Sequence, residues 1–416
     1  MHSLYKGVFI FGLAMLVSCS PAPNPKCQTE SLEEAKKSER VLTNFAVDVY
    51  KNISNQPKDK NKNEVISPVS IALLLAMLEN GADGETRKQI QQQLVEDGDA
   101  ERVLSVCRAL EKQLNIDQSK IKLQIANGIY YDKTAQLKQN YDKSTQQCLD
   151  ADVKEVDFKT QLEQTRQKIN KDISDKTQNK IPELFKKGKL NSDSEIVLAN
   201  AIYFKASWQK AFDRSASKQG PFYQQGCILN PETVDYMTAN DQYRHSADDK
   251  LQVLELQYNS QAGLSMYVLL PKERDGIKDL QKQLTGDRLR QIIGQLTMKN
   301  VQIEMPKFSI RSPSDLKPAL SAMGLDKLFT RQADLSRLSD QKLEISHAVH
   351  EAYIKIDEDG TEAAAATGAE AVNEAVLVGE PVKFVADHPF IYAVVHNPTR
   401  AVVFIGRVDD VHEKDE

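Results

Sequence analysis

One segment near the C-terminus limits the folds open to this chain more than any other. Residues 357–381, DEDGTEAAAATGAEAVNEAVLVGEP, contain no Lys, Arg or aromatic residue, yet strand-like apolar sequence flanks them on both sides. The odd positions from 361 to 373 hold only Thr, Ala and Asn. Within this segment, every glutamate after Thr361 falls at an even position: Glu362, Glu370, Glu374 and Glu380. A period of two is typical of a strand with one solvent-exposed and one buried face, so this linker-like segment also has the residue pattern of a strand.

The residues of this segment suit insertion into a sheet. A strand added to a packed sheet buries one face, where bulky or charged side chains would overpack the site. Pro would remove a ladder hydrogen bond, and residues 361–380 contain none, while Gly360 before them tolerates unusual backbone angles. At about 1 kcal/mol net for each ladder hydrogen bond, such a strand would contribute roughly 10 kcal/mol, comparable with the stability of a whole domain. So favourable an insertion would need a kinetic block to delay it. The alternative interpretation of this segment is a disordered, Ala-rich linker that never enters a sheet.

The remaining chain has the pattern of one α+β domain. Helical patterns dominate the first half of the 416 residues, whereas strand patterns dominate the second half. Residues 39–52 carry one apolar helical stripe, and residues 195–208 form a near-continuous apolar strand, typical of burial on both faces. Thr86 is expected to cap a helix. A net charge of −5 and a pI near 5.9 give no reason to expect a nucleic-acid partner.

The N-terminus has the pattern of an export signal. A basic residue precedes an apolar run from Val8 to Val17, which is short for a bilayer span. Small residues before Cys19 resemble a bacterial lipobox, which implies a signal peptide over residues 1–18 and a lipid on the Cys19 sulfur. Pro-rich sequence then gives a tether over residues 19–38. A lipid would place the protein in the cell envelope of a bacterium, at the outer membrane or cell surface; the alternative is plain secretion.

The sequence holds none of the common catalytic motifs. A nucleophile elbow, a Walker A loop and the HExxH motif are all absent, so we expect neither an enzyme nor a cofactor. His347 and His350 precede Glu351, but the surrounding alternation indicates a strand and no further ligand is placed nearby, so we expect no metal site. The cysteines beyond Cys19 have no CxxC spacing, and we expect at most one bridged pair.

Four separated segments resemble the serpin family, in the family's order. They are ISPVSIALLLAMLENGADGETRKQI, LANAIYFKASW, AVHEAYIKIDEDGTEAAAAT and DHPFIYAVVHNPTRAVVFIGRV. The resemblance covers nearly all of residues 40–409 and implies an α+β serpin fold over residues 39–412, with three β-sheets and eight to nine helices. It also implies an exposed reactive-centre loop at about residues 358–381. In such inhibitors the protease cleaves the loop and is trapped as an acyl-enzyme when the loop enters the main sheet.

The resemblance also gives roles to single residues. The family's shutter, a buried hydrogen-bond cluster that controls opening of the sheet, is matched by Ser67, Ser70, Asn200 and His350. Trp208 matches the Trp beneath the point where the loop enters, in the region called the breach. The hinge, which must insert first, is matched by Glu358, Gly360, Thr361, Glu362, Ala363, Ala364, Ala365, Ala366 and Thr367.

Two counts locate the reactive bond. Counting seventeen residues from Glu358 places it between Glu374 and Ala375. Counting back from residues 382–384 places the bond two positions further on, between Val376 and Leu377. We prefer the first count, because the inserted part must match the length of the sheet. No Lys, Arg or aromatic residue lies near either bond, so we expect elastase-like or glutamate-specific targets and no trypsin-like ones.

Two classes of function remain open from the sequence. The first is a tethered suicide-substrate inhibitor of serine proteases, with cysteine proteases as a further class of target. The second is a non-inhibitory serpin-fold binding protein whose loop is only a substrate. The hinge sequence favours inhibition. We expect a monomer whose partners are the target proteases and, through Cys19, a membrane.

The tether predicts that Cys19→Ala abolishes lipid attachment. Metabolic labelling with a radioactive fatty acid should mark the wild-type protein and leave this variant unlabelled and free of the membrane fraction. Cys27→Ala changes the next cysteine along the chain and should label like wild type. Label that persists in Cys19→Ala would show that the lipobox interpretation is wrong.

Overall fold

The structure is a computed structural model. It describes residues 38–56, 63–94, 121–139, 141, 151–224, 231–259, 263–361 and 380–411. The α-helices within these ranges are α2 (Glu39–Ser54), α3 (Pro68–Gly81), α4 (Gly84–Leu94), α7 (Leu162–Lys176), α8 (Ile277–Gln283), α9 (Gly286–Gly294) and α10 (Leu316–Leu320). None of these described helices is both long and apolar enough to cross a membrane.

Several predicted features lie outside the described residues. They are the signal peptide, the tether, all the cysteines including Cys19, the hinge from Glu362 to Thr367, and both candidate bonds, Glu374–Ala375 and Val376–Leu377. The segments 95–120 and 142–150 are also outside, so the helices named above give no helix count for the whole chain.

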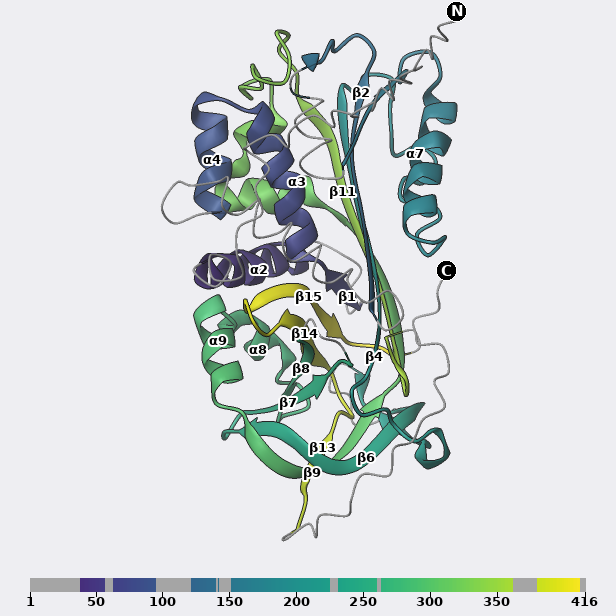
Figure 1. Cartoon of the computed structure of the whole chain (residues 1–416), viewed down its shortest axis with the longest axis vertical. Helices are drawn as coiled ribbons and strands as arrows, with labels where there is room; N and C mark the ends of the chain where they lie inside the picture. The colour runs from purple at the N-terminus through teal and green to yellow at the C-terminus, as the bar shows by residue number, and fades with distance from the viewer. Residues whose placement is uncertain are drawn as a thin grey trace, which may run out of the picture.

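The main sheet runs along the long axis of the molecule, as Figure 1 shows. Its six strands, in spatial order, are β10 (Phe308–Asp315), β11 (Ile345–Asp357), β12 (Gly360–Thr361), β4 (Ile196–Ser207), β2 (Ile121–Asp132) and β3 (Asp152–Val156). As predicted, β4 is buried on both faces along almost its whole length.

The second sheet closes one end of the molecule and packs against the main sheet. In spatial order it contains β1 (Glu64–Ile66), β15 (Ala401–Val408), β14 (Phe390–His396), β8 (Leu264–Pro271), β7 (Leu251–Gln257), β6 (Glu232–Ala247), β9 (Thr297–Pro306) and β13 (Val382–Val385), with β5 (Lys218–Phe222) beside β6. The resemblance implies three sheets, whereas backbone pairing of the described residues gives two. The reason is the long strand β6, which pairs with β9 and, over Arg244 to Ala247, also with β7.

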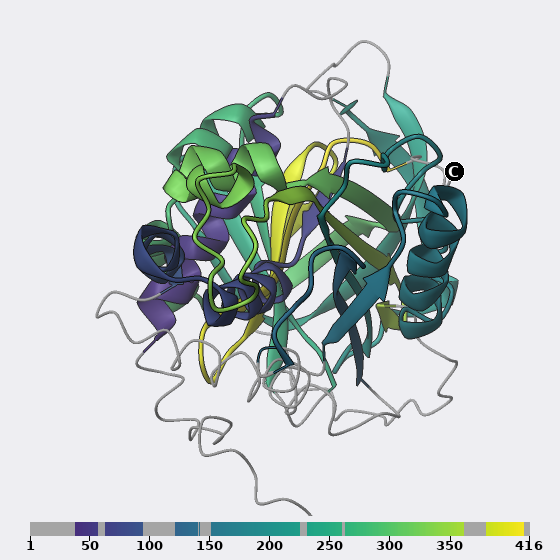
Figure 2. The ribbon, with the colours of Figure 1, turned by 90° about the horizontal axis from the view of Figure 1, so that it is seen from above.

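Three apolar clusters hold these layers together. The largest lies among helices α2, α3, α4 and α9 and the inner faces of the sheets, and the second lies between the two sheets. The third lies between α7 and the outer face of the main sheet. Figure 2 shows α7 on one side of the main sheet and helices α3 and α4 on the other. Helices packed on mixed sheets confirm the predicted α+β class.

The start of α3 fixes this helix against the main sheet. Ser67 caps the helix, because its hydroxyl accepts a hydrogen bond from the Ser70 N–H at 3.3 Å. Pro68 follows at the first helical position, where the missing N–H costs nothing. The helix is buried on nearly every side, which explains its uninterrupted apolar sequence.

Candidate functional site

The main sheet is open at one end, and β12 lies in the opening. Strands β4 and β11 pair directly in parallel from Ile196 and Ile345 as far as Tyr203 and Tyr353. Three residues further on, Thr361 of β12 pairs with Ala206 of β4 on one side and with Ile356 of β11 on the other, antiparallel to both. The two residues of β12 therefore separate β4 from β11 at this end of the sheet, whereas the two strands pair directly further along.

Only glycine fits at the start of this short strand. Gly360 has φ +141°, a conformation that side chains rarely adopt. A Cβ added there would meet the Ala206 carbonyl and would lie 2.6 Å from Ser207 Cα and 2.8 Å from the Trp208 nitrogen. The turn therefore brings its backbone directly against that of β4.

Aromatic side chains lie beneath β12 at the open end of the main sheet. The Trp208 indole Nε1 donates to the Asp357 carbonyl at 2.9 Å, and its ring stacks on Tyr258 with centroids 4.5 Å apart. The Tyr258 hydroxyl lies 3.0 Å from the Thr361 hydroxyl, and Thr361 has no exposed surface. The structure thus places Trp208 beneath the residues that lead into the loop.

Charged groups hold the turn between β11 and β12. The carboxylate of Glu358 accepts from Ser217 Oγ and pairs with Lys307 Nζ, each at 2.7 Å. Burial by itself would raise the pKa of Glu358, but the hydrogen bonds from Lys307 and Ser217 hold that pKa below its ordinary value. Asp359 pairs with Arg214. These contacts anchor both ends of the turn to the second sheet and its connections.

A buried polar cluster crosses the sheet below the opening. His350 Nε2 accepts from the Ser67 N–H at 3.1 Å, so Nδ1 carries the ring proton and donates it to Asn200 Oδ1. Asn200 Nδ2 donates to Ser70 Oγ at 2.7 Å and to Asn127 Oδ1. His350, Asn200 and Asn127 are register partners on β11, β4 and β2. The cluster therefore ties three strands to the start of α3.

The structure brings the four predicted shutter residues together and adds one. Asn127 was missed, because nothing in its local sequence shows that it would stand beside Asn200. Lys307, Ser217 and Tyr258 were missed for the same reason, since each contacts the turn from a distant part of the chain. Only strand register could have found them.

The histidine pair does not form a metal site. His347 and His350 are three residues apart on a strand, so their side chains lie on opposite faces of the sheet. Within the described ranges, no group of three or more His, Cys, Asp or Glu side chains is arranged to hold a metal ion.

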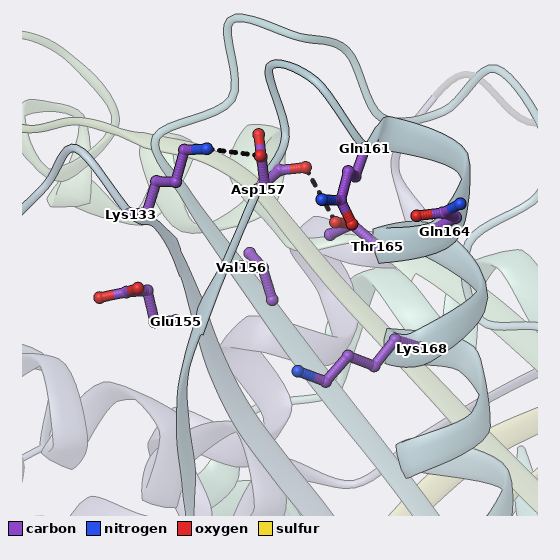
Figure 3. A pocket seen from close by; sticks show the side chains of 8 residues that line it. All are labelled: Lys133, Glu155, Val156, Asp157, Gln161, Gln164, Thr165 and Lys168. Carbon is purple, nitrogen blue, oxygen red and sulfur yellow. Dashed lines mark hydrogen bonds and ion pairs between the residues drawn. The ribbon is translucent and has the colours of Figure 1, made fainter.

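A surface hollow of about 360 Å³ lies where α7 begins (Figure 3). Lys133 Nζ donates to the Asp157 carboxylate at 2.6 Å, and the Thr165 hydroxyl donates to the Asp157 carbonyl at 2.9 Å. Lys168 extends toward the hollow from the helix. The lining mixes both signs of charge and includes no pairing of a nucleophile with a general base, so we assign it no chemistry.

Comparison with known proteins agrees with this architecture. The family described as "Serpin (serine protease inhibitor)" matches residues 40–411. Leukocyte elastase inhibitor of Equus caballus is 35% identical over 373 residues, which are 88% of this chain and 97% of that protein. Among solved structures, uncleaved ovalbumin superposes with a TM-score of 0.80 at 27% identity, covering 90% of this chain and 99% of the other. Tengpin, a thermophilic serpin in its native state, gives a TM-score of 0.80 at 26% identity, covering 90% and 94%.

The absence of catalytic motifs gives the expectation that the chain is no enzyme, beside the two classes of function that the resemblance leaves open. The comparisons replace this negative expectation with a positive class, because the matching family and the equine relative are both named as inhibitors. At this site the structure shows a two-residue strand, β12, held between β4 and β11 at the open end of the main sheet.

The close approach at Gly360 predicts that Gly360→Ala destabilises the intact protein. The added methyl group combines an unfavourable φ with backbone overlap, so we expect a loss of about 2 kcal/mol or more, seen as a lower midpoint of thermal unfolding. Gly188 also has a positive φ, +81°, but open space where its Cβ would lie. Gly188→Ala should therefore cost clearly less, and equal losses in the two variants would contradict the overlap.

Proposed function

The chain belongs to the serpin family, and we propose that it inhibits serine proteases as a suicide substrate. The protease recognises the residues after β12 as a substrate. After cleavage these residues insert between β4 and β11, along the line where the two strands pair, which we call the seam. The observation that carries this proposal is the position of β12, which already runs antiparallel between the two strands. A segment can add to a sheet as a new strand once the backbone groups of its neighbours are free, which here requires that β4 and β11 separate.

The register on the two sides of the gap supports continued insertion. Ile356 and Ala206, the partners of Thr361, each lie three residues beyond Tyr353 and Tyr203, which are partners of each other. A strand that continued from Thr361 would therefore meet both neighbours in step. Its residue 367 would arrive between His350 and Asn200, where a threonine hydroxyl could replace part of the hydrogen bond broken as those two side chains separate.

The trapping step follows ordinary acyl-enzyme chemistry. The protease nucleophile attacks the carbonyl carbon of Glu374, an ester forms, and the bond to Ala375 breaks as its nitrogen takes a proton. The freed N-terminal part of the loop then enters the seam and carries the attached protease with it. Hydrolysis of the ester by water would release an active protease, so inhibition requires that insertion be faster than deacylation.

The buried cluster around His350 supplies the kinetic block that this mechanism requires. Separating β4 from β11 breaks the hydrogen bond between His350 and Asn200, and no water is at hand to replace it, because both side chains are fully buried. The closed sheet is thereby held until cleavage frees the loop.

The target class follows from the residues around the bond. The small aliphatic residues Ala375 and Val376 fit the shallow apolar pocket of an elastase-like enzyme, and Glu374 fits a cationic pocket. The name of the equine relative, leukocyte elastase inhibitor, supports the elastase-like class. We further propose that the protein acts as a monomer held at a bacterial cell envelope by a lipid on Cys19.

A non-inhibitory binding protein is the second candidate, and one gel separates the two. The chain is incubated with elastase-like and glutamate-specific serine proteases and run in SDS. An adduct that survives SDS at the summed mass of the two proteins supports inhibition. Complete cleavage of the loop without adduct, by every protease that cuts it, would support the alternative.

The buried position of Thr361 predicts that Thr361→Arg turns the inhibitor into a substrate. A long cation on the buried face should slow insertion until deacylation wins, because burying an unpaired charge is costly. The stoichiometry of inhibition should rise several-fold at an unchanged rate of loop cleavage. Glu362→Arg introduces the same side chain at the neighbouring even position and should stay near wild type. Wild-type stoichiometry in Thr361→Arg would show that the buried position of Thr361 in the sheet is not needed for insertion of the loop.

The hinge count predicts that Glu374→Arg creates inhibition of trypsin. The substituted residue would supply the cation that a trypsin pocket reads and that the loop otherwise lacks. Its even position leaves the buried face unchanged, so trapping should survive. Mass spectrometry of the fragment released from the wild-type complex gives the cut directly. A new N-terminus at Ala375 supports Glu374, whereas one at Leu377 would move the reactive residue to Val376.

A further inference from the structure

The pair Tyr203 and Tyr353 is the first directly bonded pair below the opening of the main sheet. The two residues are register partners across the seam between β4 and β11. Both are almost fully buried, and their ring centroids lie 6.1 Å apart. Any strand that enters from Thr361 must separate this pair before it reaches the cluster around His350.

One cation lies over both rings across the seam, and a second lies over the Tyr353 ring alone. Lys180 Nζ lies 5.9 Å from the ring centroid of Tyr203 and 5.8 Å from that of Tyr353, so one ammonium group caps both strands. The Arg311 guanidinium lies 5.7 Å from the Tyr353 ring and donates to the Lys180 carbonyl at 2.8 Å. Lys180 belongs to the segment after α7, and two left-handed residues, Gln178 and Asn179, turn the chain to place it there.

A buried carboxyl group completes the arrangement. Glu351 lies two residues before Tyr353, so it is on the same face of β11, and its side chain is only 5% exposed. Its Oε1 is 3.7 Å from Arg311 Nε, which is longer than a hydrogen bond. We call Lys180, Tyr203, Arg311, Glu351 and Tyr353 the seam latch.

The surroundings of Glu351 compensate its charge only in part. Arg311 approaches from β10, and Lys186 approaches from the segment after α7. The register partners of Glu351, Ala201 on β4 and Pro313 on β10, carry no charge. Burial raises the pKa of Glu351 to about 7, against the lowering effect of Arg311 and Lys186.

We propose that Glu351 sets the rate at which β4 and β11 separate, and that its ionisation loosens the seam latch. A buried carboxylate is costly where no hydrogen bond to it is complete, and separation of the strands relieves that cost by admitting water. The neutral acid carries no such cost and favours the closed sheet. The inference rests on the proposed insertion of the loop and adds its control by pH.

The sign of the pH dependence follows from linkage. The carboxyl group holds its proton more tightly in the closed sheet, with a pKa of about 7, than in an opened sheet where it approaches its ordinary value of 4.5. The stabilisation that protonated Glu351 gives to the closed sheet is therefore complete below pH 4.5. It is lost as the pH rises through the closed-sheet pKa of about 7. If water fully hydrated the Glu351 carboxylate on opening, insertion would be faster at pH 8 than at pH 5.5 by about 25-fold. Partial hydration of the carboxylate would give a smaller increase.

Uptake of a synthetic peptide measures the opening without any protease. The probe is an N-acetylated peptide with the sequence of residues 361–374, TEAAAATGAEAVNE, added in excess to the full chain. Trp208 is the single tryptophan of the chain and lies at the opening, so its fluorescence should report uptake, and a native gel confirms it. For wild type we expect the uptake rate to rise at least fivefold from pH 5.5 to pH 8.

Three variants test the two parts of the proposal. Glu351→Gln is a neutral isostere, and its uptake rate should be no faster than the slow wild-type value of pH 5.5 and should change less than twofold across the range. Glu155→Gln changes an exposed carboxylate on the edge strand of the same sheet and should keep the wild-type profile. Lys180→Met keeps the aliphatic stem and removes the charge above the rings, so uptake should be about three- to tenfold faster at every pH, with the pH slope retained.

The outcomes separate this inference from the proposed function. A wild-type pH slope in Glu351→Gln would overturn the control by Glu351. An unchanged rate in Lys180→Met would overturn the seam latch as a barrier. If wild type took up the peptide at no pH, the insertion mechanism itself would fail, and this inference with it, whereas uptake that is independent of pH would leave insertion intact and overturn only the role of Glu351.

Discussion

The direct pairing of β4 with β11 is the interaction on which the rest of the structure depends. It closes the main sheet from Ile196 and Ile345 to Tyr203 and Tyr353, and the helices on both faces pack across it. The same hydrogen bonds must break if a further strand is to be added. A stable native state and the proposed insertion would thus place opposite demands on one ladder, and the surrounding side chains would decide how readily it opens.

Two layers of contacts lie on the opposite faces of this ladder. On the inner face, His350 and Asn200 join the strands to the capped start of α3 through buried hydrogen bonds. On the outer face, Lys180 covers the tyrosines of both strands from the segment after α7. Because the side chains of β11 alternate between these faces, neighbouring residues such as His350 and Glu351 act on the same seam from opposite sides.

Much of the fold could be predicted from the sequence, since local patterns determine it. The apolar run of β4, the Ser67-Pro68 start of α3 and the helix over residues 39–52 all follow from period and capping. Contacts between distant segments could not be predicted. Thr86 was expected to cap a helix, and that prediction is wrong, because α4 begins at Gly84 and the Thr86 hydroxyl instead accepts from the Asp334 N–H. The partners of Glu358 and the place of Asn127 likewise depend on strand register, which no local pattern encodes.

The antiparallel position of β12 between two parallel strands bears on how many times one molecule could act. A strand inserted along this line would replace one parallel pairing with two antiparallel ones, and antiparallel pairing is the more stable per residue. Among the described residues β4 and β11 enclose one such gap, so once a strand filled it no second insertion could follow. Protection would then scale with the number of intact molecules present, and a cell could restore its reserve only by new synthesis.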